Sequence, residues 1–114
     1  MMTMTGKDRW QRVASRAAIK QGEILATQLG DLAIALTEVD GRIHAISDVC
    51  THEYAQLSQG YLEADEIECP LHAARFNIRT GRCLAGPATQ DLDIYEVKIE
   101  ADDVYVRRAE QKSE

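Results

Sequence analysis

The chain is poor in aromatic residues and proline and has an odd number of cysteines, and these features limit which kinds of protein it can be. Its 114 residues include one Trp, one Phe, four Tyr, two Pro and three Cys. An odd number of cysteines without an export signal does not suit a disulfide framework, so metal binding is the better use of the thiols. No apolar run is long enough to span a bilayer, and the N-terminal "MMTMTGKDRW" lacks the apolar segment of a secretory signal. We therefore expect a cytoplasmic protein without a membrane segment.

Positive charge is also in short supply. The chain has 13 Lys and Arg against 19 Asp and Glu, which gives a formal net charge of −6. Nucleic acids and anionic membranes require a basic face, so we expect neither as a partner. The Gly-x-Gly-x-x-Gly loop that binds a nicotinamide or flavin cofactor is missing too. The length allows one domain, whose small core a bound metal would help to stabilise.

Short segments with alternating apolar and polar residues, separated by turn signals, predict an all-β antiparallel fold. Only residues 15–22 suggest a helical turn or two, with Ser15 as the N-cap. We expect a small antiparallel β-sandwich or barrel that carries its functional residues in loops at strand ends. The strand candidates are residues 23–29, 32–39, 42–47, 61–69, 75–84 with a turn at Thr80-Gly81, 93–100 and 104–108.

Two cysteines and two histidines gather in two short clusters, Cys50-Thr51-His52 and Cys69-Pro70-Leu71-His72. Together they offer four ligands, enough for one structural zinc ion or one iron–sulfur cluster. Zinc knuckles usually have two to four residues between paired ligands, whereas a single residue separates Cys50 from His52. The spacing favours a diiron cluster with both cysteines on one iron and both histidines on the other.

The pattern Cys-x-His, sixteen residues, then Cys-x-x-His resembles the Rieske [2Fe–2S] signature. The flanks "DVCTH", "GYLEADEIECPLHAARFNIRTGR" and "GPATQDLDIYEVKIEADDVYV" resemble the ferredoxin component of multi-component aromatic-ring-hydroxylating dioxygenases, such as the naphthalene and biphenyl systems. The similarity extends from about Trp10 to Val106. It implies a fold of three small antiparallel sheets, with one [2Fe–2S] cluster held by two loops at the tip. The iron ligands would be Cys50, His52, Cys69 and His72.

The resemblance implies a one-electron carrier that is not an enzyme by itself. It would pass electrons from an NAD(P)H-dependent ferredoxin reductase to a terminal Rieske non-haem iron oxygenase. Because His44 is the only histidine outside the clusters, the chain cannot supply the two histidines of a mononuclear iron site. We expect a monomer in solution that docks its oxygenase around the cluster, near His52, His72, Leu71 and Pro87.

Two alternative functions stay open. The chain could be a small Rieske subunit of another oxidoreductase, such as a nitrite reductase, or a zinc-stabilised interaction module. As for its organisation, we expect a flexible N-terminus over residues 1–9, a Rieske domain over residues 10–107 and a polar C-terminal tail over residues 108–114.

Four positions depart from the cytochrome bc₁-type Rieske proteins. Ala55 and Leu71 stand where those proteins carry a disulfide that braces the cluster loops. Ala74 and Phe76 replace a serine and a tyrosine that donate hydrogen bonds to sulfur atoms. Fewer donors leave the reduced, more negative cluster less stabilised, so we expect a reduction potential near the low end of the Rieske range, roughly −150 mV.

Three further residues receive more ordinary interpretations. Cys83 is expected to be a small buried hydrophobe on a strand, and His44 an ordinary strand histidine. Arg75 lies three residues beyond His72, and it could contact a partner or pair with the acidic segment 53–68.

Overall fold

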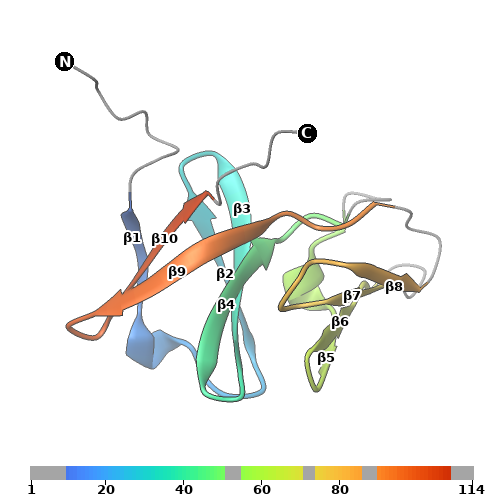
Figure 1. Cartoon of the computed structure of the whole chain (residues 1–114), viewed down its shortest axis with the longest axis horizontal. Helices are drawn as coiled ribbons and strands as arrows, with labels where there is room; N and C mark the ends of the chain where they lie inside the picture. The colour runs from blue at the N-terminus through green and yellow to red at the C-terminus, as the bar shows by residue number, and fades with distance from the viewer. Residues whose placement is uncertain (1–9, 51–54, 71–73, 86–89, 109–114) are drawn as a thin grey trace.

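The computed structural model describes residues 10–50, 55–70, 74–85 and 90–108. The predicted N-terminal segment 1–9 lies outside these residues, as does the predicted C-terminal tail 108–114 apart from Arg108. Within the described residues the strands form two antiparallel sheets that lie side by side (Figure 1). The larger sheet has the order β1-β10-β9-β4-β3-β2 and consists of β1 (Gln11–Ser15), β2 (Ile24–Leu29), β3 (Leu32–Val39), β4 (Arg42–Ser47), β9 (Ile94–Glu100) and β10 (Asp103–Arg108). The smaller sheet has the order β5-β6-β7-β8 and consists of β5 (Tyr61–Glu63), β6 (Glu66–Glu68), β7 (Arg75–Asn77) and β8 (Cys83–Ala85).

The larger sheet is made of two three-stranded parts. Strands β4 and β9 join them through only two residue pairs, Ala45 with Tyr95 and Ile46 with Ile94. With the smaller sheet this makes three antiparallel groups of strands, which is how the three expected sheets appear in this chain. The outer strands β1 and β2 also approach each other, because the Thr27 hydroxyl donates a hydrogen bond to the backbone carbonyl of a β1 residue 2.9 Å away. The larger sheet therefore curls toward a barrel.

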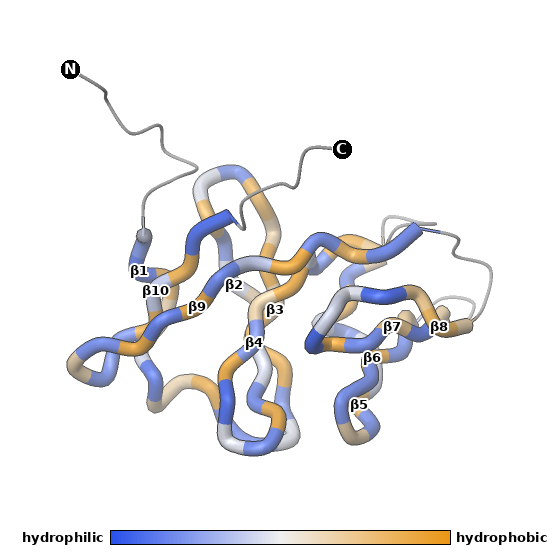
Figure 2. Tube along the Cα trace, viewed as in Figure 1, coloured by the Kyte–Doolittle hydropathy of each residue, from blue (hydrophilic) through white to orange (hydrophobic). Residues whose placement is uncertain are grey.

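Alternating hydropathy gives the curled sheet an apolar inner face. Hydrophilic and hydrophobic residues alternate along β9 and β10 (Figure 2), and Val104 and Val106 of β10 are fully buried. Their side chains share one face because successive residues of a strand point to opposite faces. The core inside this sheet consists of Ala14, Ile19, Leu29, Ile34, Leu36, Ile43, Ala45, Val104 and Val106.

A second core lies between the two sheets. Ala35 and Ile46 of the larger sheet contribute to it, together with Ile67 and Phe76 of the smaller one. The smaller sheet has only three residues in each strand, too few to bury a core by itself, so it depends on the larger sheet for its stability. The members of this second core are Ala35, Val39, Ile46, Cys50, Leu57, Ile67, Cys69, Ala74, Phe76, Ile78 and Leu92.

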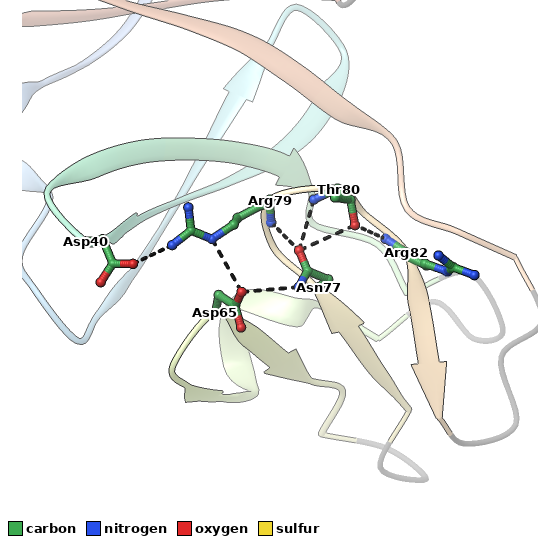
Figure 3. Close-up of polar contacts among 6 residues, drawn as sticks. All are labelled: Asp40, Asp65, Asn77, Arg79, Thr80 and Arg82. Atoms are coloured by element: carbon green, nitrogen blue, oxygen red, sulfur yellow. Dashed lines mark hydrogen bonds and ion pairs between the residues drawn. The ribbon is translucent and has the colours of Figure 1, made fainter.

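Arg79 connects turns of the two sheets (Figure 3). Its guanidinium pairs with Asp40 in the turn between β3 and β4 and with Asp65, 3.3 Å away, in the turn between β5 and β6. The Asn77 amide donates to Asp65 at 3.3 Å, while its carbonyl oxygen accepts the backbone N–H groups of Arg79 and Thr80 at 2.9 and 3.1 Å. The network links the turn between β5 and β6 to the turn between β3 and β4.

The all-β antiparallel fold is confirmed, and β3 and β4 coincide with the predicted strands 32–39 and 42–47. The single strand predicted over residues 61–69 is wrong. Ala64 has a φ of 55°, in the left-handed region, so the chain turns there and β5 pairs back with β6. Alternation alone did not reveal the turn, because neither residue at its centre is Gly, Pro or Asn.

The helical turns predicted over residues 15–22 shrink to one 3₁₀ turn, η2 (Arg16–Ala18), in which the Ser15 side chain caps nothing. Strand β1 was not predicted, because its partner β10 is about ninety residues away and its local pattern is weak. No helix among the described residues is long and apolar enough to cross a membrane.

Two glycines with left-handed backbone conformations allow the cost of a steric clash to be separated from the cost of backbone strain. A Cβ on Gly81, at φ 78°, would collide with the carbonyl oxygen of Leu92, whereas a Cβ on Gly41, at φ 82°, would meet nothing within 4 Å. We expect Gly41→Ala to cost only the left-handed penalty of about 1–2 kcal/mol. Gly81→Ala should lower the melting temperature, followed by circular dichroism, clearly further; equal decreases would contradict the contact with Leu92.

Candidate metal centre

Cys50 lies at the start of the first candidate ligand loop, three residues after β4. Its side chain is 2% exposed, and its backbone N–H donates to the carbonyl of Ala55 at 3.0 Å. Val49 and Gln56, one residue further out on each side, form an isolated antiparallel bridge. Two adjacent contacts therefore close the neck of the loop and hold Cys50 at the protein core.

Asp48, next to the Val49–Gln56 bridge, also stabilises the closed base of this loop. It is 1% exposed, and its carboxylate accepts hydrogen bonds from the backbone N–H of Ser58 at 2.6 Å and from the Ser58 hydroxyl at 2.8 Å. The backbone carbonyl of Asp48 also accepts the N–H of Leu57 at 2.8 Å. The buried carboxylate therefore fixes the short helix η3 (Leu57–Gln59) against the strand that leads to Cys50.

Cys69 begins the second candidate loop, directly after β6. Its side chain is 1% exposed, and its backbone N–H donates to the carbonyl of Ala74 at 2.7 Å. Strands β6 and β7, which flank the loop, pair Glu68 with Arg75 and Ile67 with Phe76. The loop is thus the connection of a β-hairpin, and the hairpin sets the position of Cys69.

The two loops share one construction. In each, the N–H of the cysteine donates to the carbonyl five residues further along, Cys50 to Ala55 and Cys69 to Ala74. Both cysteines belong to the same buried core, between the two sheets. Two sequence clusters that are nineteen positions apart therefore place their thiols in one region of the molecule.

The other predicted site residues lie outside the described part of the chain. His52 falls in segment 51–54, Leu71 and His72 in segment 71–73, and Pro87 in segment 86–89. Among the described residues, no group of three or more His, Cys, Asp or Glu side chains is arranged to hold a metal ion. The ligand assignment therefore stays a prediction.

The surroundings of the two cysteines are apolar and compact. Ala74 and Phe76 stand where the cytochrome bc₁-type Rieske proteins carry a serine and a tyrosine. Both residues are fully buried, and neither has a side-chain hydroxyl. Cys83 lies on β8 and is only partly buried against this core, so it is more exposed than expected. His44 is on β4, as predicted for a strand histidine.

Arg75 pairs with the acidic segment, one of the two roles considered for it. Its guanidinium lies 2.7 Å from Glu63, 3.2 Å from Glu66 and 3.9 Å from Glu68. The hydrogen bond with Glu63 is the largest of the effects that raise the pKa of Arg75, so this side chain stays charged at every ordinary pH. One cation at the base of the second loop thus offsets part of the charge of three neighbouring carboxylates.

The donor set fits an iron–sulfur cluster. A buried thiolate is costly unless a metal neutralises its charge, and here two cysteines are buried at the necks of two similar loops. Each loop carries a histidine two or three residues later. Two thiolates and two imidazoles are the ligands of a Rieske [2Fe–2S] cluster, in which two histidines replace two cysteines on one iron.

Sequence comparisons agree with this chemistry. The family described as Rieske [2Fe-2S] domain matches residues 9–96. The ferredoxin component of the naphthalene 1,2-dioxygenase system of Pseudomonas putida is 44% identical over 92 residues, which cover 81% of this chain and 88% of the relative. The ferredoxin subunit of a 3-phenylpropionate/cinnamic acid dioxygenase from Escherichia coli O139:H28 is 44% identical over 91 residues, covering 79% and 85%.

Solved structures show the same similarity in space. The ferredoxin of Sphingomonas yanoikuyae B1 superposes with a TM-score of 0.83 at 34% identity, covering 89% of this chain and all of that one. A chain from the complex of reduced oxygenase and oxidized ferredoxin in carbazole 1,9a-dioxygenase gives a TM-score of 0.81 at 33% identity, covering 90% and 97%.

The Asp48 anchor generates a stability prediction. Asp48→Ala leaves the Ser58 N–H and hydroxyl without their acceptor, and a buried unsatisfied donor costs about 1–3 kcal/mol. We expect a lower melting temperature and a reduced iron content per purified chain, because the neck below Cys50 loosens. Ser58→Ala is the matched control, since it removes one hydrogen bond and keeps the backbone one. If both variants retained full iron content and equal stability, Asp48 would not be an anchor of this loop.

Proposed function

The chain belongs to the Rieske [2Fe–2S] family, and from this we propose that it is the ferredoxin of an aromatic-ring dioxygenase system, a one-electron carrier without catalysis of its own. The observation that carries the proposal is the 44% identity to such ferredoxins over 88% of the length of the Pseudomonas putida relative. Oxygenases with the same fold are matched over far less of their length, for instance 35% of dicamba monooxygenase. The similarity is therefore to the carrier as a whole.

We propose Cys50, Cys69, His52 and His72 as the ligands of one [2Fe–2S] cluster. When bound, the cluster supplies the capacity to accept and release one electron at a time. The thiolates of Cys50 and Cys69 would bind from the core side, where both side chains are buried. Two histidines in place of two thiolates keep the site less negative, which favours reduction compared with a ferredoxin that has four cysteine ligands.

The partners we propose are an NAD(P)H-dependent ferredoxin reductase and a terminal Rieske non-haem iron oxygenase. One similar solved structure is a complex of an oxygenase with a ferredoxin, which supports an oxygenase partner. Docking would take place around His52, His72, Leu71 and Pro87, so that the electron crosses a short distance. Redox encounters of this kind are small and transient. A cytoplasmic location suits a carrier that receives its electrons from a nicotinamide cofactor.

The first experiment compares two cysteine variants of the anaerobically purified protein. We expect the wild type to be red-brown, to contain iron and sulfide in equal amounts, and to give an EPR signal only after dithionite reduction. Cys69→Ser should lose the colour and the iron, whereas Cys83→Ser should keep both. A colourless wild type holding one zinc ion would support the zinc-module alternative instead, and loss of iron in Cys83→Ser would contradict the ligand assignment.

Replacing one histidine tests which residues set the potential. His72→Cys adds a thiolate charge where a neutral imidazole would bind, so the midpoint potential should fall by on the order of 100 mV, toward ferredoxins with four cysteine ligands. His44→Cys is the control and should leave the midpoint potential unchanged. Protein-film voltammetry measures both; an equal or higher potential in His72→Cys would contradict its role as a ligand.

A further inference from the structure

A cavity opens in the wall of the larger sheet, where β9 leaves β4. The two strands are paired at Ala45–Tyr95 and Ile46–Ile94 only. Beyond these pairs the start of β4 pairs with β3, and the rest of β9 pairs with β10, so their facing edges diverge (Figure 1). The resulting cavity has a volume of about 400 Å³, which is within the range of small-molecule sites. Neither Cys50 nor Cys69, the two described candidate ligands, is among its described lining residues.

Part of the wall of this cavity is apolar. Isoleucines 43, 78, 94 and 99 contribute to it, as do Tyr95 and Val97. Ile94 is 36% exposed and Ile99 is 44% exposed, which makes them two of the four exposed large hydrophobic side chains among the described residues. Covering exposed apolar area of this kind with an apolar ligand is favourable, because it removes that area from water.

The charge of the lining is of one sign. In a chain of net charge −6, the lining includes Arg16, Arg42, Arg79 and Lys98 but no Asp or Glu among the described residues. Three of these cations already have acidic partners outside the lining. Arg16 pairs with Glu38 at 3.1 Å and Lys98 with Glu100 at 3.6 Å, and Arg79 pairs with Asp40 and Asp65.

Arg42 differs from the other three cations. It is exposed at the first position of β4 and forms no ion pair with any described residue. The cavity therefore holds four positive side chains but a single one whose charge is not already compensated nearby. A site of this kind matches a ligand with one negative charge, since a second charge would have no uncompensated partner.

After Arg42, His44 is the second polar side chain of the lining that lacks a partner among the described residues. Its Nε2 is buried and has no hydrogen-bond partner in the described part of the chain, while the residue contributes other atoms to the lining of the cavity. Burial, Arg79 and Arg42 all lower the pKa of His44, so the imidazole is neutral at pH 7. In the tautomer with the proton on Nε2, this atom would donate a hydrogen bond to an anion once a movement of the side chain exposes it to the cavity.

We propose that this cavity binds a small organic monocarboxylate with an apolar body. The carboxylate pairs with the Arg42 guanidinium, whose planar donors match two carboxylate oxygens, and it accepts a hydrogen bond from Nε2 of His44. The apolar body covers Ile94 and Ile99. This site is separate from the proposed electron-carrier function, and its test does not depend on electron transfer.

The test is equilibrium dialysis of the iron-loaded protein against radiolabelled benzoate, with benzamide and inorganic phosphate as competitors. We expect saturable binding of benzoate at one site, at millimolar or lower concentration. Benzamide, which has the same shape without the charge, should compete weakly, and phosphate, which lacks an apolar body, should not compete. Absence of saturable binding would overturn the proposal, and equal competition by benzamide would overturn the role of charge.

Matched variants locate the site. Arg42→Gln should weaken benzoate binding about tenfold or more, because a charge-assisted hydrogen bond is lost. Arg82→Gln is the control, since Arg82 is also exposed, forms no ion pair with a described residue, and points away from Arg79 (Figure 3). His44→Phe keeps a ring but removes Nε2, and it should weaken binding as well. Equal loss in Arg42→Gln and Arg82→Gln, or unchanged binding in both Arg42→Gln and His44→Phe, would place the benzoate elsewhere and overturn the proposal. The visible spectrum of each variant verifies that it is folded.

Discussion

Two backbone hydrogen bonds hold the part of the structure on which the proposed function depends. The N–H of Cys50 donates to Ala55, and the N–H of Cys69 donates to Ala74. Each closes a short loop at its neck and keeps a cysteine at the edge of the core shared by the two sheets. Backbone geometry and packing position the two thiols. A cluster held by these two cysteines would link folding and cofactor binding, because Cys50 follows a strand of the larger sheet and Cys69 follows a strand of the smaller one.

The smaller sheet depends on electrostatic links as well as on its core. Arg79 joins the β3–β4 turn to the β5–β6 turn through Asp40 and Asp65, and Arg75 is surrounded by three glutamates. Each pair is partly exposed and is screened by solvent, so none contributes much alone. Arg75 and Glu68 are also cross-strand partners in β6 and β7, the two strands that flank the second candidate loop.

The narrow junction between β4 and β9 has two consequences. It lets the larger sheet curl and bury its own core, and it gives the smaller sheet an apolar surface to pack on, through Ile46. It also leaves unpaired strand edges on the other side, where the cationic cavity opens. Electron transfer would use the candidate loops after β4 and between β6 and β7, whereas ligand binding would use Arg42 and His44 on β4 and Ile94 and Ile99 on β9.

The sequence by itself determined the chemistry and the class of fold. Four candidate ligands at the spacing of Cys50, His52, Cys69 and His72 indicate an iron–sulfur cluster without any structure, because residue type and local spacing largely decide which metal centre can be bound. Alternation also revealed β3 and β4, whose patterns are long and bounded by turns.

Only the tertiary structure decided what depends on distant partners. Strand β1 forms because β10 pairs with it. The chain turns at Ala64 because β5 and β6 pair with each other. Both thiols lie in one core because the two sheets pack together. The cavity beside Arg42 and His44 follows from where two strands separate. Such features result from contacts between segments far apart along the chain, and a local pattern of residues does not encode them.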